Sequence, residues 1–100
     1  LANLSIARIA YEQGQLSKSA DYYQRIPRKS PNFQRALYEM THLHMKASGT
    51  FKDPDRRYEA LRKALETLEI LAGFPNLTWK MSIETSILRG RINVLLGMLN

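Results

Sequence analysis

Two histidines and a neighbouring glutamate are the residues of this chain whose types and spacing could support metal or acid–base chemistry. Glu39 and His42 form a Glu-x-x-His pair, the spacing that places two ligands on one helix face in di-metal bundles. Such a site needs a second pair and further carboxylates, which this sequence does not supply. His42 and His44 cannot share a ligand, because two positions on a helix separate their side chains by about 200°. The sequence therefore predicts no metal site.

Motifs that mark catalytic sites are also absent from the sequence. It has no Gly-rich phosphate loop, no Gly-x-Ser-x-Gly turn and no His-Glu-x-x-His motif. Asp53 and Asp55 are better explained by capping of a helix start. Glu59 can pair with Arg62 or Lys63 at helical spacing. Since no nucleophile–base pair is visible, we predict that the protein is not an enzyme and uses no cofactor.

The composition is that of one small globular domain. The chain has 100 residues, of which 44% are hydrophobic and 24% are charged. No apolar run approaches the roughly 18–20 residues that a membrane span requires, so no membrane insertion is expected. The absence of cysteine excludes disulfides and thiolate metal sites. The net charge of +6 permits acidic partners without demanding them.

The hydrophobic periodicity predicts helices only. Apolar residues recur at three- and four-residue spacing, and no segment alternates with the period of a strand. Gly and Pro residues divide the chain into five expected helices. They run from Leu4 to Gly14, from an N-cap at Ser17 to Ile26, from Ser30-Pro31 to Ser48, from an N-cap at Asp53 to Gly73, and from Met81 to Asn100.

An internal repeat is visible when the helices are taken in pairs. Pairs of small residues lie seven positions apart on the first, third and fifth helices, which leaves a notch where a neighbouring helix can approach closely; they are Ala7 with Gly14, Thr41 with Ser48, and Gly90 with Gly97. The second and fourth helices share a small residue followed by larger ones four and seven positions on: Ser19, Tyr23 and Ile26, and Ala64, Leu68 and Leu71.

This pattern resembles the tetratricopeptide repeat, a helix–turn–helix unit of about 34 residues. The resemblance implies an all-α fold of antiparallel helical hairpins stacked as a right-handed solenoid. It divides the chain into a first repeat at 1–33, a second at 34–80 with an extended turn or second helix, and the first helix of a truncated third at 81–100. The chain is then expected to be a piece of a longer multi-repeat protein.

The resemblance also implies a binding surface. In this family the first helix of every pair lines a concave groove in which peptides lie, and interfaces favour tyrosine, arginine and methionine. The expected function is that of a protein–protein interaction scaffold whose groove binds a peptide or protein. The positions that match the groove are Arg8, Tyr11, Glu12, Arg35, Tyr38, His42, Met45 and Arg91.

The last helix carries more apolar residues than an exposed helix should. Leaving even three of them in water costs several kcal/mol, at about 1.5–3 kcal/mol for each large side chain. Self-association through this helix, which pairs it with another copy, is therefore the alternative function. The residues expected on this face are Ile83, Ile87, Ile92, Leu95, Leu96 and Leu99.

Two further expectations concern partners and location. Basic residues near Tyr22 and Tyr23 make a nucleic-acid adaptor conceivable, but acidic residues are interspersed among them, so this ranks third. The stretch 25–39 is similar to repeat proteins of bacterial cell envelopes. That similarity implies a bacterial, periplasmic protein, with the cytoplasm as the alternative.

Overall fold

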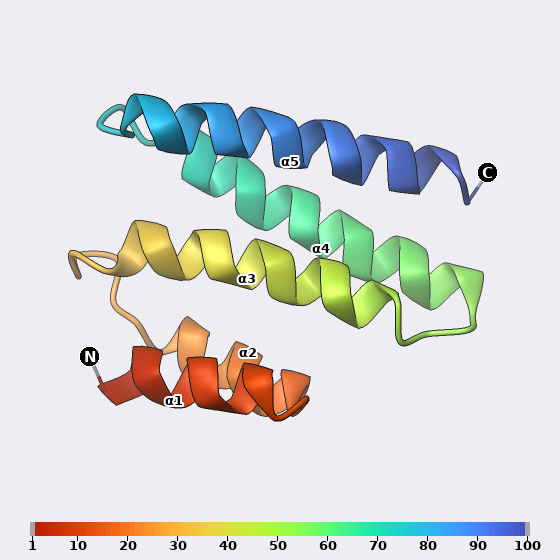
Figure 1. Ribbon diagram of the computed structural model, residues 1–100, viewed down its shortest axis with the longest axis horizontal. Coiled ribbons are helices and arrows are strands. Elements are labelled where there is room, and N and C mark those ends of the chain that lie inside the picture. Colours follow the sequence, from red (N-terminus) through yellow and green to blue (C-terminus); the bar gives the residue numbers. More distant parts are fainter. Residues whose placement is uncertain (1, 100) are drawn as a thin grey trace.

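A computed structural model describes residues 2–99 of the chain, and the fold is all-α (Figure 1). Its five helices are α1 (Ala2–Glu12), α2 (Leu16–Gln24), α3 (Phe33–Ser48), α4 (Pro54–Ala72) and α5 (Trp79–Gly97). No strand occurs among residues 2–99. The predicted class and the five predicted helices are confirmed.

Two of the predicted helix boundaries follow directly from local chemistry. Gly14 adopts φ +78° after α1, a left-handed conformation that costs glycine little. The amide nitrogens of Gly14 and Gln15 donate to the carbonyl oxygens of Tyr11 and Ala10, 3.0 and 2.9 Å away, which is the Schellman arrangement for ending a helix. The Asp53 carboxylate caps α4 by accepting from the Asp55 amide at 3.0 Å.

Other predicted boundaries were wrong by one to three residues. Helix α2 begins at Leu16 rather than after Ser17, and it ends at Gln24, before the turn that leads to Pro27. Helix α3 begins at Phe33 because the Ser30 hydroxyl accepts from the Asn32 amide at 3.1 Å and holds a turn there.

The last helix also begins and ends earlier than predicted. The Thr78 hydroxyl accepts from the Met81 amide at 3.1 Å, so Thr78 is the N-cap and α5 starts at Trp79. The helix ends at Gly97, whereas the predicted end at Asn100 lies outside the described residues.

The helices are arranged in chain order across a flat molecule. Each packs on its chain neighbours, and consecutive helices run in opposite directions (Figure 1). The α1–α2 pair and α5 therefore lie at opposite ends of the row. The molecule measures 38 × 30 × 17 Å, and its shortest dimension is less than two helix diameters of about 10–12 Å. The fifth helix extends the row and does not fold back into its centre.

The interior consists of two apolar clusters that meet at α3. The first joins α1, α2, the turn after α2 and α3, and contains Leu4, Ala7, Tyr23, Ile26, Ala36, Met40 and Leu43. The second joins α3, α4 and α5, and contains Leu37, Ala64, Leu68, Leu71, Leu88 and Ile92. Because α3 contributes to both clusters, it couples the two ends of the molecule.

Small residues occupy the closest helix contacts. Ala7, Ser19, Thr41 and Ala64 are fully buried, as expected for positions where two helices approach closely. The Ser19 hydroxyl donates to the Ala7 carbonyl at 2.7 Å, and the Thr41 hydroxyl donates to the Leu37 carbonyl at 2.9 Å. These bonds offset the cost of removing the two hydroxyls from water. Among residues 2–99, no buried side-chain nitrogen or oxygen lacks a partner.

Truncation of a core residue on α4 tests the second cluster. Leu68 is fully buried, so we expect Leu68→Ala to lower the free energy of unfolding by about 2–5 kcal/mol through lost burial and a cavity. Ile70→Ala is the matched control, because Ile70 lies on the same helix and is 49% exposed. Urea unfolding followed by circular dichroism measures both. Equal losses for the two variants would contradict this packing.

Candidate functional site

A network of three side chains ties α1, α2 and α3 together on one side of the molecule. The Arg8 guanidinium donates from Nε to Glu39 Oε1 at 2.9 Å and from Nη2 to Oε2 at 2.7 Å. The Tyr23 hydroxyl also donates to Oε1, at 2.8 Å. The two-pronged arginine contact fixes the orientation of the carboxylate as well as its position. Glu39 is thus a fixed anion among fixed donors.

The environment of Glu39 keeps it ionised. Burial raises the pKa of the carboxyl, but the hydrogen bonds from Arg8 and Tyr23 outweigh burial, and the net pKa lies below the ordinary value. Burial and the bond to Glu39 raise the pKa of Tyr23 far above its ordinary value. At neutral pH the network therefore consists of a carboxylate, a guanidinium and a neutral phenol.

An open hollow of about 330 Å³ surrounds this network. Four residues predicted for the groove, namely Arg8, Tyr11, Glu12 and His42, line it together with Tyr23 and Glu39. The Lys46 ammonium lies over the Tyr11 ring, 4.6 Å from its centroid, and Tyr38 packs edge-on against His42 with centroids 4.9 Å apart. Aromatic faces and charged groups therefore share one surface.

Residues of α5 continue the surface beyond His42. Burial and the Glu84 carboxylate raise the pKa of Tyr38, and burial and the Arg91 guanidinium lower the pKa of His42. These effects require Glu84 and Arg91 to lie close to α3. Arg35 is exposed, and its charge helps to lower the pKa of Glu39. We call this surface of α1, α3 and α5 the polar groove.

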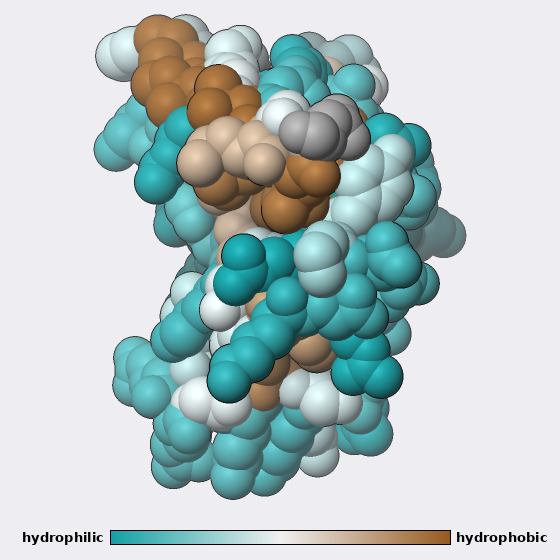
Figure 2. All heavy atoms as spheres, turned by 90° about the vertical axis from the view of Figure 1, so that its right-hand side faces the viewer, coloured by the Kyte–Doolittle hydropathy of each residue, from teal (hydrophilic) through white to brown (hydrophobic). Residues whose placement is uncertain are grey.

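The space-filling view shows the shape of this side. Figure 2 views the molecule end-on, and its outline is indented along the left edge, which corresponds to the side facing the viewer in Figure 1. The indentation lies between the α1–α2 end and the α5 end. Of the eight residues predicted for the groove, Tyr38 and Met45 are half-buried and pack against the second core cluster. Tyr38 also contacts His42, which lines the hollow, whereas Met45 is not among the residues that line it.

The residues predicted for the self-association face differ in burial and fall into three groups. Ile83, Ile87 and Leu95 are exposed. Ile92 is fully buried and Leu96 packs against the second core cluster, so their assignment to that face was wrong: both lie on the side of α5 that covers α4. Leu99 is half-buried. The structure adds three exposed apolar residues that the prediction omitted, namely Trp79, Val94 and Met98.

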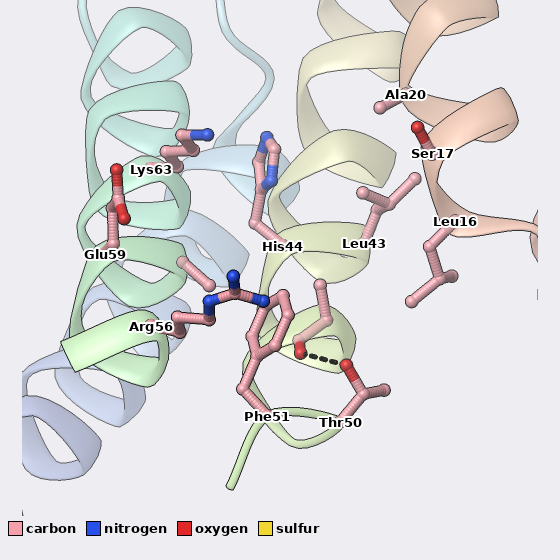
Figure 3. A pocket seen from close by; sticks show the side chains of 12 residues that line it. Leu16, Ser17, Ala20, Leu43, His44, Thr50, Phe51, Arg56, Glu59 and Lys63 are labelled. Atoms are coloured by element: carbon pink, nitrogen blue, oxygen red, sulfur yellow. Dashed lines mark hydrogen bonds between the residues drawn. The ribbon is translucent and has the colours of Figure 1, made fainter. Parts of the chain in front are cut away.

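A second hollow, of about 510 Å³, lies between α2, α3 and α4 and was not predicted. His44 points into it from α3, with Leu16 and Ser17 on one side and Lys63 on the other (Figure 3). Burial and the charge of Lys63 lower the pKa of His44. The spacing of His44 from His42 indicated that the two side chains diverge, and the structure places them in different hollows.

The residues that the structure describes contain no metal cluster and no membrane-spanning helix. Within residues 2–99, no group of three or more His, Asp or Glu side chains lies close enough to hold a metal ion. None of the five helices has both the length and the apolar character to cross a bilayer. Comparison with protein-family models, with curated proteins and with solved structures gives no match.

The Glu39 network gives a prediction about pH. A carboxyl whose pKa is lowered by folding adds stability above its unfolded pKa, about 4.3, and loses it as the pH falls through the folded value. We expect Glu39→Gln to cost about 1 kcal/mol at neutral pH, because Arg8 is half exposed and water screens its charge. Urea unfolding at pH values from 7 downward measures the difference in free energy of unfolding between the wild-type chain and Glu39→Gln. This difference should become smaller below about pH 4.3, and a larger difference there would contradict the network.

The two histidines give a second prediction, with each serving as the control for the other. Removing the charge beside His42 by Arg91→Gln should raise the pKa of His42 and leave that of His44 unchanged. Lys63→Gln should raise the pKa of His44 and leave that of His42 unchanged. NMR titration of the imidazole protons measures both values. If Arg91→Gln left the pKa of His42 unchanged, the Arg91 guanidinium could not lie close to His42 as described.

Proposed function

We propose that the chain is built of tetratricopeptide-like hairpins and that the polar groove binds a segment of another protein. In this proposal α1–α2 and α3–α4 are two hairpins, and α5 is the first helix of a third. Three observations support it: the alternating helix directions, the order of packing, and the two fully buried small residues Ala7 and Thr41. Those two are 34 positions apart, the period of the family.

The observation that carries the binding role is the fixed network at the centre of the groove. Arg8, Tyr23 and Glu39 hold one another in place before any ligand arrives. A surface that is already ordered loses less conformational freedom on binding, so more of the contact energy appears as affinity. The aromatic rings of Tyr11 and Tyr38 lie beside this network and offer rigid apolar contact.

The charges of the groove favour a partner segment with carboxylates. Arg8 is already paired with Glu39, whereas Arg35, Lys46 and Arg91 are exposed on the same side. Guanidinium groups bind carboxylates through forked hydrogen bonds, and the net charge of +6 attracts acidic chains over longer distances. The proposed ligand is therefore an acidic segment that also carries apolar or aromatic side chains. The proposed role is binding, without a catalytic step.

Selection from a library of random peptides displayed on phage tests this function. We expect the recovered peptides to be enriched in Asp, Glu and apolar residues. Their affinity should fall at least about tenfold for Tyr38→Ala and for Arg91→Ala, as is usual for central interface residues. The matched controls are Tyr58→Ala and Arg62→Ala, which remove exposed side chains of the same types from α4. Isothermal titration calorimetry measures each affinity.

The controls also define the result that would overturn the proposal. Peptides that lose affinity for the α4 variants and keep it for the groove variants would place the binding site elsewhere. Failure to recover any peptide above background, with the wild-type chain folded by circular dichroism, would count against a peptide-binding groove of any kind.

A further inference from the structure

Helix α5 packs against the interior on one side and is exposed to solvent on the other. Its buried residues Thr85, Leu88 and Ile92 face the interior. Helices α1 and α3 each pack against an antiparallel neighbour that follows them, α2 and α4, whereas among residues 2–99 nothing follows α5 in this way. The side of α5 turned away from α4 is therefore open to a further helix.

An apolar stripe runs along this open side for the whole length of the helix. Its members are spaced by three or four positions, which places them on one helix face, and each large one is at least half exposed. We call it the α5 stripe; it consists of Trp79, Ile83, Ile87, Gly90, Val94 and Met98. Apolar residues gather at the top of Figure 2, over α5. An exposed apolar patch of this extent indicates an interaction site.

The α5 stripe is symmetric about its own midpoint, between Leu88 and Arg89. Reversing the helix direction superimposes Trp79 on Met98, Ile83 on Val94, and Ile87 on Gly90. A twofold interface requires this kind of self-complementary surface, because each copy presents the same residues to the other. We propose that the α5 stripe binds a second copy of this chain, with the two α5 helices antiparallel around a twofold axis at that midpoint.

Gly90 gives the pairing its close contact. A Cβ atom added at Gly90 would meet nothing within 4 Å in the single chain, so the glycine leaves an open notch on the surface. In the antiparallel pair this notch receives Ile87 of the second copy. Small residues on α1 and α3, Ala7 and Thr41, are fully buried beneath neighbouring helices. At Gly90 the second copy supplies the helix that covers the notch.

The charges beside the stripe also match in this orientation. Glu84 and Arg91 flank the same edge of the stripe, seven positions apart. When two helices pair antiparallel, residues on the same flanking edge of the two copies face each other, so Glu84 of one copy lies near Arg91 of the other. The twofold axis produces this ion pair twice. In a parallel pairing the two copies of this edge would lie on opposite sides of the contact, so Glu84 of one copy would not face Arg91 of the other.

The available area is of the order that a dimer needs. The exposed parts of the stripe, with Leu95 beside it, which is 37% exposed, amount to several hundred square ångströms per copy, which approaches the roughly 800 Å² per partner of a standard interface. This dimer does not depend on the proposed peptide-binding function, since the stripe is formed by α5 and its C-cap residue Met98.

Sedimentation equilibrium over a range of concentrations tests the dimer. We expect the wild-type chain to be dimeric, and we expect Ile87→Asp to weaken self-association at least about tenfold, because it places a carboxylate in the centre of the apolar contact. Ile70→Asp is the matched control: Ile70 is exposed to a similar degree on α4 and should leave the dimer intact. Circular dichroism confirms that each variant is folded.

Disulfide cross-linking tests the antiparallel register. The chain has no cysteine of its own. In an equimolar mixture of Ile83→Cys and Val94→Cys chains, mild oxidation should yield mainly the mixed disulfide dimer. Neither variant alone should cross-link efficiently, because in the antiparallel pair its two copies of the cysteine are about 16 Å apart along the axis.

Three outcomes would overturn the proposal. One is a wild-type chain that stays monomeric at its highest soluble concentration, which would leave the stripe to a different partner, such as a helix from a longer chain. Another is a dimer weakened by Ile70→Asp and not by Ile87→Asp. The third is efficient cross-linking of each single cysteine variant, which would indicate a parallel pair.

Discussion

A half-buried carboxylate that three helices share sets the register in which the first hairpin packs on α3. Removing an ionised glutamate from water is costly unless it is paired and hydrogen-bonded. Glu39 of α3 meets this condition only when Arg8 of α1 and Tyr23 of α2 reach it together. The first hairpin must therefore dock on α3 in one register. Apolar contacts alone specify register less strictly, because they are not directional.

Helix α3 transmits this constraint to the rest of the molecule. Its buried residues belong to two clusters, one shared with α1 and α2 and the other with α4 and α5. Met40 faces the first cluster and Leu37 the second, so a rotation of α3 that improved one contact would spoil the other. The groove residues Tyr38 and His42 lie on the same helix and are positioned by both clusters.

Sequence patterns gave the elements reliably and the long-range contacts poorly. Helical periodicity, Gly14 and Asp53 are local signals, and the class, the number of helices and those two ends were predicted from them. The contact between Arg8 and Glu39 spans 31 positions, and no local pattern indicates it. The wrong assignments of Ile92 and Leu96 on α5 have a similar cause. Because this helix has apolar residues on most of its sides, periodicity could not show that Ile92 faces α4 while Ile87 faces solvent.

The polar groove and the α5 stripe meet at Arg91. In the single chain the charge of Arg91 helps to lower the pKa of His42. In the proposed dimer the same guanidinium lies beside Glu84 of the second copy, whose negative charge offsets part of the charge that Arg91 presents to the groove. The coupling free energy between two binding events is reciprocal. If dimer formation changes the affinity of the groove for an acidic segment by some factor, binding of that segment changes the affinity of self-association by the same factor. Since one cation serves both surfaces and an acidic ligand competes for it, the physical expectation is opposition: ligand binding in the groove weakens the dimer, and the dimer weakens the groove.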